Sequence, residues 1–146
     1  MSGKIFPTAQ DAESAFYEAL ERCDLDGMMA VWAEDEEIVC VHPAGARLTG
    51  QDQVRESWAK MFAAGPRARL TIEQQVAISG MMLAVHSVFE SFTLPAAKGP
   101  AQPAPIVATN VYLRTAAGWR MIVHHASPAP AQPQPAPRDP APKTLH

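Results

Sequence analysis

The spacing of the apolar residues changes near residue 66, and this change limits the folds that the chain can adopt. Before it, apolar residues recur every three or four positions, as on the buried face of a helix. After it, apolar and polar residues alternate, as in a half-buried strand. Gly65 and Pro66 separate the two regions. A run of helices followed by a run of strands predicts an α+β fold, with the helices packed on one face of the sheet.

Three helices are predicted before the change. The first covers Gln10 to Arg22, and the second covers Leu25 to Trp32 with Asp24 as its N-cap. The third covers Gln51 to Ala63 and ends at the Gly-Pro pair. Their large side chains fall on apolar faces that predict a shared core: Phe16, Met28, Met29, Trp32, Val54, Trp58, Met61 and Phe62.

The strands are expected at 38–42, 47–49, 67–78, 81–94, 106–115 and 119–127. Alternation in the third of these places five residues on one face: Leu70, Ile72, Gln74, Val76 and Ile78. In the last strand, alternation places His125 with Trp119, Met121 and Val123, and places His124 on the opposite face with Arg120 and Ile122. His125 is therefore expected to face the core, although either histidine could line a pocket.

Composition narrows the class of protein. The chain has 146 residues, of which 47% are hydrophobic, and a net charge of −3. That predicts one domain, and the absence of a basic cluster argues against nucleic acid as a partner. No apolar run approaches the ~20 residues of a membrane span, so we expect no contact with a membrane. The N-terminus has no apolar leader, so we expect a cytoplasmic protein whose two cysteines, Cys23 and Cys40, are free thiols.

The domain is expected to occupy residues 9–127, after an N-terminal arm at 1–8. Residues 128–146 contain seven of the fourteen prolines. Proline lacks an N–H group and cannot continue a helix or pair inside a sheet. This tail is therefore predicted to be disordered or polyproline-like.

Four segments carry a family resemblance: CDLDGMMAVWAEDEEIVCVHPAG, LTGQDQVRESW, FESFTL and GWRMIVHHASP. In this order and spacing the chain resembles the nuclear transport factor 2-like superfamily, in particular its ketosteroid-isomerase-like and SnoaL-like (polyketide-cyclase-like) proteins. The resemblance covers roughly Ala9 to Pro128. It implies a cone in which three helices pack on a strongly curved, mainly antiparallel sheet. It also implies a homodimer formed through the outer face of the sheet.

The resemblance to ketosteroid isomerase can be followed residue by residue. The position of its aspartate base holds His42, before Pro43. The position of its tyrosine donor holds Phe16, with Tyr17 as a neighbour, and the position of its protonated aspartic acid holds Asn110. These differences argue against classical steroid isomerase activity.

Four residues are candidates for catalysis. His42 could act as a general base, because the unperturbed pKa of histidine lies near neutral pH. Asn110 and Tyr112 could donate to a developing oxyanion, and His125 could orient the substrate. Each also has a purely structural interpretation, as a turn cap or a satisfied core residue. Further residues are candidates for lining a ligand pocket: Phe16, Trp32, Trp58, Phe62, His86 and His124.

Two functions from different classes fit these residues. The first is a small-molecule-binding protein. If it is catalytic, it would be a cofactor-independent isomerase, cyclase or dehydratase that acts by proton transfer on a hydrophobic carbonyl compound. The second is a non-catalytic ligand-binding or association module, since fold does not decide function. The histidines lack HxH or HExxH spacing, so no metal and no cofactor are expected. Catalysis by His42 requires that it and Asn110 converge on one cavity.

Overall fold

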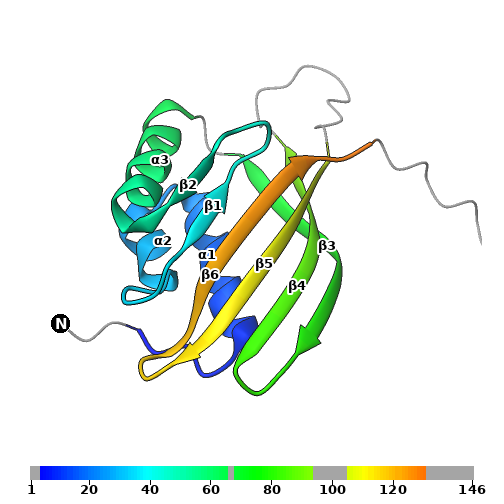
Figure 1. Ribbon diagram of the computed structural model, residues 1–146. Coiled ribbons are helices and arrows are strands. Elements are labelled where there is room, and N and C mark those ends of the chain that lie inside the picture. The colour runs from blue at the N-terminus through cyan, green and yellow to red at the C-terminus, as the bar shows by residue number, and fades with distance from the viewer. Residues whose placement is uncertain (1–3, 66–67, 94–104, 131–146) are drawn as a thin grey trace, which may run out of the picture.

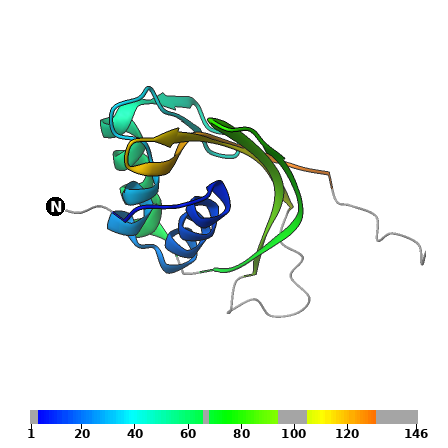
Figure 2. The same ribbon diagram turned by 90° about the horizontal axis from the view of Figure 1, so that it is seen from below.

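The computed structural model describes residues 4–65, 68–93 and 105–130. Within them, three helices lie on the concave side of one curved six-stranded sheet, which wraps around the first helix (Figures 1 and 2). The predicted α+β cone is therefore confirmed. The helices are α1 (Ala9–Arg22), α2 (Leu25–Val31) and α3 (Gly50–Ala64). The strands are β1 (Val39–Val41), β2 (Arg47–Thr49), β3 (Arg69–Ser79), β4 (Leu83–Thr93), β5 (Ile106–Thr115) and β6 (Gly118–Pro128).

The strand order across the sheet is β2-β1-β6-β5-β4-β3. Every neighbouring pair is antiparallel except β1 and β6, which run parallel. The long strands β3 to β6 each pair antiparallel with the next one along the chain and form the curved wall, while β1 and β2 cover the side next to α3. Element boundaries differ from the predicted ones by only a few residues, except where the prediction runs into residues outside the described ranges.

Local hydrogen bonds explain where the helices begin and end. The Thr8 hydroxyl accepts a hydrogen bond from the Asp11 backbone N–H (3.0 Å), and the Asp24 carboxylate accepts one from the Gly27 N–H (3.1 Å). Both contacts satisfy N–H groups that the first helical turn leaves free, which confirms Asp24 as the predicted N-cap. Cys23 ends α1 in a left-handed conformation, with φ of 54°. Trp32 is the C-cap of α2 rather than its last helical residue.

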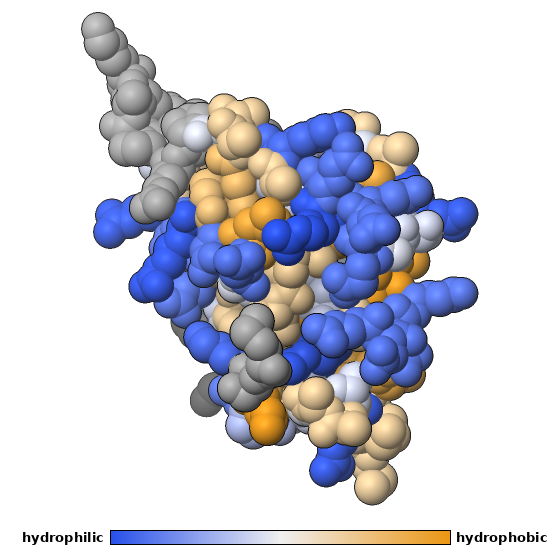
Figure 3. Space-filling model, turned by 90° about the vertical axis from the view of Figure 1, so that its left-hand side faces the viewer, coloured by the Kyte–Doolittle hydropathy of each residue, from blue (hydrophilic) through white to orange (hydrophobic). Residues whose placement is uncertain are grey.

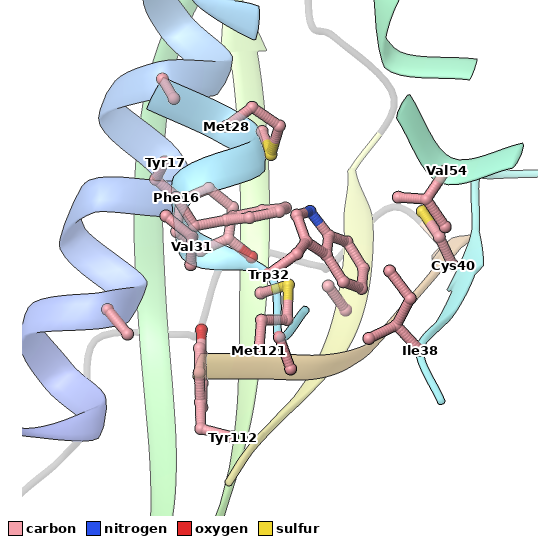
Figure 4. Close-up of a cluster of buried hydrophobic side chains, with 14 of the residues drawn as sticks. Phe16, Tyr17, Met28, Val31, Trp32, Ile38, Cys40, Val54, Tyr112 and Met121 are labelled. Atoms are coloured by element: carbon pink, nitrogen blue, oxygen red, sulfur yellow. The ribbon is translucent and has the colours of Figure 1, made fainter. Parts of the chain in front are cut away.

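The apolar core lies between the helices and the concave face of the sheet (Figure 4). Phe16 of α1 lies at its centre, edge-on to Trp32 (6.4 Å between ring centroids) and to Trp58 (5.7 Å). All three side chains are at most 1% exposed. Edge-to-face packing of this kind adds to the free energy gained from burial of the rings.

The predicted face pattern of β3 is wrong beyond Glu73. A β-bulge lies between Glu73 and Val76, where Gln74 adopts a φ of 52°. The extra residue moves each later side chain to the opposite face. Val76 and Ile78 are therefore 60% and 65% exposed instead of facing the core.

A second irregularity reverses the predicted assignment of the two adjacent histidines. The pairing of β5 with β6 shifts by one residue, so that Val111 pairs with Val123 but Tyr112 pairs with Met121. Because of this shift, His124 faces the core and is 2% exposed, whereas His125 is exposed. The prediction that His125 is the core histidine is wrong.

Seen from the side of α2, α3 and β2, the surface is largely hydrophilic with smaller hydrophobic areas (Figure 3). Within the described residues, no helix is long and apolar enough to cross a membrane. Cys23 and Cys40 form no disulfide there. The predicted tail lies outside the described residues from 131 onward, and its conformation remains a prediction.

Gly118 is the first residue of β6, and a substitution there tests the contact between β6 and the N-terminal segment. Its φ is 94°, and an added Cβ would lie 2.8 Å from the backbone oxygen of Phe6. Phe6 forms an isolated β-bridge with Gly118. Gly50 has a similar φ of 83° but open space around it. Gly118→Ala should therefore lower the free energy of unfolding by about 2 kcal/mol or more, and Gly50→Ala by about 1 kcal/mol, in urea titrations. Equal losses would show that the contact with Phe6 contributes nothing.

Candidate functional site

Two carboxyl groups lie inside the cone, and together they define the candidate site. Glu13 occupies the core face of α1, one turn before Tyr17, and is 2% exposed. Glu90 occupies the inward face of β4, by the same alternation that buries His86 and Val88, and is 3% exposed. Glutamate is rarely buried without partners, so each of these carboxyl groups is expected to have hydrogen-bond donors beside it in the interior.

Glu13 accepts hydrogen bonds from three strands. Its Oε2 atom accepts from the Tyr112 hydroxyl (2.7 Å), from His86 Nδ1 (2.9 Å) and from Asn110 Nδ2 (3.2 Å). Its Oε1 atom accepts from the amide of Gln75. A carboxylate only accepts, so Nδ1 is the protonated nitrogen of His86 in this contact. These four donors replace the water that Glu13 loses on burial.

Glu90 has one side-chain partner in the described residues, the hydroxyl of Tyr17, which donates to its Oε2 atom (2.7 Å). Burial raises the pKa of Glu90 to about 7; the Tyr17 hydrogen bond works against this, and repulsion from Glu13 adds to it. Burial also raises the pKa of the Tyr17 phenol, followed by the effect of the nearby Glu90 charge. Glu90 can therefore gain or lose a proton near neutral pH while Tyr17 keeps its own.

Asn110 joins the two carboxyl groups to His124. Its Nδ2 atom donates to Tyr17 (2.9 Å) and to Glu13, and its Oδ1 atom lies 2.6 Å from His124 Nδ1. Burial lowers the pKa of His124 to about 3, with smaller contributions from His42 and His125. His124 is thus neutral and donates through Nδ1. The donors run in one direction, from His124 through Asn110 and Tyr17 to Glu90.

His42 lies outside this network. It is half-buried, and its Nε2 atom lies 3.1 Å from the Ser57 hydroxyl. Ser57 uses its own hydrogen on the Val54 carbonyl oxygen (2.8 Å), so His42 is the donor in their contact. Burial lowers the pKa of His42. The ring of Trp58 packs edge-on against it at 4.6 Å and lies 6.0 Å from the ring of His124.

The structure thus brings some of the predicted site residues together and leaves others apart. Asn110, Tyr112, His86 and His124 meet at the network. The donors of Asn110 and Tyr112 are already engaged by Glu13 and Tyr17 rather than free for a ligand oxyanion. Four of the predicted lining residues instead belong to the apolar core or its edge: Phe16, Trp32, Trp58 and Phe62.

A pocket of about 300 Å³ adjoins the network between α1 and β3. Its lining includes the two α1 members of the network, Glu13 and Tyr17, together with Gln75 of β3. Two larger pockets, of about 560 and 380 Å³, contain no member of the network. Within the described residues, no group of three or more histidine, cysteine, aspartate or glutamate side chains could hold a metal ion.

Four residues of the network were not among the site residues predicted from the sequence: Glu13, Tyr17, Gln75 and Glu90. A signal for Glu90 was present, because alternation put this carboxyl on the same strand face as Ala84, His86 and Val88. Glu13 was less visible, because an acidic residue in the first turns of a helix also has an ordinary role there. Gln75 could not be placed, because it faces inward only as a result of the bulge.

The sequence profile of the SnoaL-like domain matches residues 10–132. Among curated proteins, none matches the chain. Many solved structures do match.

A protein from Thiobacillus denitrificans, provisionally named a calcium/calmodulin-dependent protein kinase type II association domain, is 44% identical, with a TM-score of 0.80 over 87% of this chain and 99% of its own. A protein from Streptomyces avermitilis, provisionally named a dehydratase of the NTF2-like family, is 31% identical, with a TM-score of 0.73 over 82% and 92%. A protein from Parabacteroides distasonis, provisionally named a ketosteroid isomerase, is 18% identical, with a TM-score of 0.69 over 90% and 98%. The last likeness shows the fold alone.

The pH dependence of stability tests the protonation of Glu90. The pKa of Glu90 rises from 4.5 to about 7 on folding. Protonated Glu90 therefore favours the folded state below pH 4.5, and this stability is lost as the pH rises to about 7. Glu90→Gln keeps an acceptor for Tyr17 and carries no charge. As the pH is raised from 5 to 8, the free energy of unfolding of Glu90→Gln should therefore rise by up to about 3 kcal/mol relative to that of the wild type.

Urea titrations of both proteins at the two pH values measure this difference. His124 is present in both, so its titration cancels. The exposed Glu37 supplies a control, and Glu37→Gln should follow the wild type at each pH. If Glu90→Gln also follows the wild type, Glu90 titrates like an exposed carboxyl group and the assignment is wrong.

Proposed function

This chain belongs to the SnoaL-like domain family of the nuclear transport factor 2-like superfamily, and from that premise we propose that it binds a small molecule and transfers a proton through Tyr17 and Glu90. One observation carries the proposal. A buried carboxyl group with a pKa of about 7 is hydrogen-bonded to Tyr17, a residue that also lines a pocket. A general base is most effective when its pKa lies near the working pH.

The direction of the hydrogen bonds indicates how the proton would move. With Glu90 ionised, the Tyr17 hydroxyl donates to Glu90 and accepts from Asn110. A proton leaving the ligand would bind to the Tyr17 oxygen as the phenol proton passes to Glu90. The net result is one proton moved from the ligand to Glu90, without a free phenolate. Burial raises the pKa of Tyr17 and so disfavours its phenolate form, which this route does not pass through.

Proton removal next to a carbonyl group is the reaction class that this arrangement supports best. It needs a base and no cofactor, and it is the common step of isomerases, cyclases and dehydratases that act on carbonyl compounds. Asn110 holds the Tyr17 hydroxyl in place by a hydrogen bond, and Glu13 accepts a second hydrogen bond from the same Asn110 amide. This assignment gives Tyr17 and Glu90 the catalytic role that the sequence suggested for His42, whose hydrogen-bond partner is Ser57.

Hydrogen–deuterium exchange tests the reaction without knowledge of the natural substrate. The protein would be incubated in D₂O with a panel of small enones and β,γ-unsaturated ketones, and loss of the proton next to the carbonyl followed by NMR. Exchange by the wild type should rise as the pH passes about 7. Glu90→Gln and Tyr17→Phe should each reduce it by about 10² or more, whereas Glu37→Gln should not.

Thermal-shift measurements on the same panel separate binding from catalysis. Ligands that stabilise the protein without any exchange would reduce the proposal to a non-catalytic binding protein. If no panel member binds or exchanges, the proposal of a carbonyl ligand fails.

A second function, self-association, is favoured by a specific feature of the sheet. One row of β-branched side chains crosses five strands in register on the outer face. The relative from Thiobacillus denitrificans, 44% identical, is provisionally named an association domain. We propose that this row packs against a second copy of the chain, and it consists of Val39, Val123, Val111, Val85 and Ile78.

Val111 occupies the centre of this row and provides the test. Val111→Lys places a charge in the proposed contact and should convert a dimer to a monomer in sedimentation equilibrium at micromolar protein concentration. Ala63→Lys, on an exposed position of α3, should leave the mass unchanged. A wild type that sediments as a monomer rules out this function, and circular dichroism checks that the variant is folded.

A further inference from the structure

Gln75 reaches the interior only because of the bulge in β3. Glu73 pairs with Phe89 and Val76 pairs with Ser87, so Gln74 and Gln75 together lie opposite the single residue between them on β4. Gln74 takes up a left-handed φ of 52° there, which is unusual for a residue with a side chain. Bulges often redirect a side chain beside a functional site. Here the bulge directs the Gln75 amide to Glu13 Oε1.

The interior that Gln75 covers contains two carboxyl groups, and no lysine or arginine of the described residues forms a salt bridge with either. The carboxyl groups of Glu13 and Glu90 are close enough for Glu13 to raise the pKa of Glu90. Among the described residues, the imidazole of His86 is the basic group within salt-bridge distance of either carboxyl group. A carboxylate buried in a protein is normally paired with a cation or held by hydrogen bonds.

We propose that the pocket between α1 and β3 takes a ligand with a protonated amino group, which replaces the Gln75 amide at Glu13. This inference rests on the proposed function and adds the chemical class of the ligand. The Gln75 amide offers two N–H donors and no charge, so it is a neutral substitute for an ammonium group. Unlike the other three donors to Glu13, it belongs to an exposed residue on an edge strand. It can therefore leave without opening the core.

The lining of the pocket suits this ligand. An ammonium group has three N–H donors, and the pocket wall supplies acceptors besides Glu13 in the side chains of Gln10 and Ser14. Ile72 gives the wall an apolar part that a hydrocarbon or ring could contact. The volume of about 300 Å³ lies at the lower end of ligand pockets and suits a small amine.

Binding of matched small probes tests the proposal. Benzylamine and benzyl alcohol have the same size and differ in the group presented to Glu13. Isothermal titration calorimetry should give a dissociation constant at least ~10-fold lower for the amine than for the alcohol. Gln75→Ala removes the competing amide and should strengthen amine binding several-fold. Thr71→Ala, an exposed position on the same strand, should change neither affinity.

Gln75→Lys provides a second test that does not weaken the network. Its ammonium group, held by the chain itself, would take the position of the ligand at Glu13. This variant should have a higher melting temperature than the wild type and should no longer bind benzylamine. Glu13→Gln, where it folds, should abolish the preference for the amine over the alcohol.

The outcomes separate this inference from the proposed function. Equal affinities for amine and alcohol, or no amine binding at all, would overturn the ammonium site and leave proton exchange through Glu90 untouched. A clear amine preference without any exchange of carbonyl compounds would support the site and overturn the proton transfer.

Discussion

The hydrogen bonds of Glu13 are the contacts on which the interior of the cone depends. They tie α1 to three successive strands, through Gln75 of β3, His86 of β4, and Asn110 and Tyr112 of β5. Removing one of the three buried donors, His86, Asn110 or Tyr112, would leave part of a buried carboxylate unsatisfied at a cost of about 1–3 kcal/mol or more, so these three residues and Glu13 act as a unit. The same unit fixes Asn110, and Asn110 in turn fixes the Tyr17 hydroxyl beside Glu90. The geometry of the titrating pair is therefore a consequence of the way in which α1 docks.

The interior is divided into an apolar half and a polar half. Phe16, Trp32 and Trp58 fill the part next to α2 and α3, while Glu13 and Tyr17 of α1 face Glu90 and the other inward polar side chains of β3, β4 and β5. Phe16 and Tyr17 are adjacent on α1 and pack edge-on at 4.9 Å, so one helical turn serves both halves. The apolar half supplies the free energy of burial and the low dielectric that raises the pKa of Glu90.

Much of the fold could be predicted from the sequence, because the change from helical to alternating spacing and the helix caps are local signals. The face of a side chain along a bulged strand could not, since one extra residue reverses every later position and alternation carries no sign of it. This is why His124 and His125 were assigned to the wrong faces and why Val76 was grouped with Leu70 and Ile72. The site was predicted in part. Asn110, Tyr112 and His86 lie on regular strand segments and were identified, whereas Gln75 depends on the bulge.

Self-association and ligand chemistry do not compete for residues on this sheet, because alternate positions of the same strands would carry them. On β5, Asn110 and Tyr112 point into the cone while Val111, between them, points outward. A second copy packed on Val111 would restrain the backbone that holds Asn110 and, through it, Tyr17. Proton transfer depends on the placement of such groups within fractions of an ångström. An association surface on the outer face would therefore help to hold the residues of the inner site in place. Assembly through the outer face would not by itself argue against chemistry inside the cone.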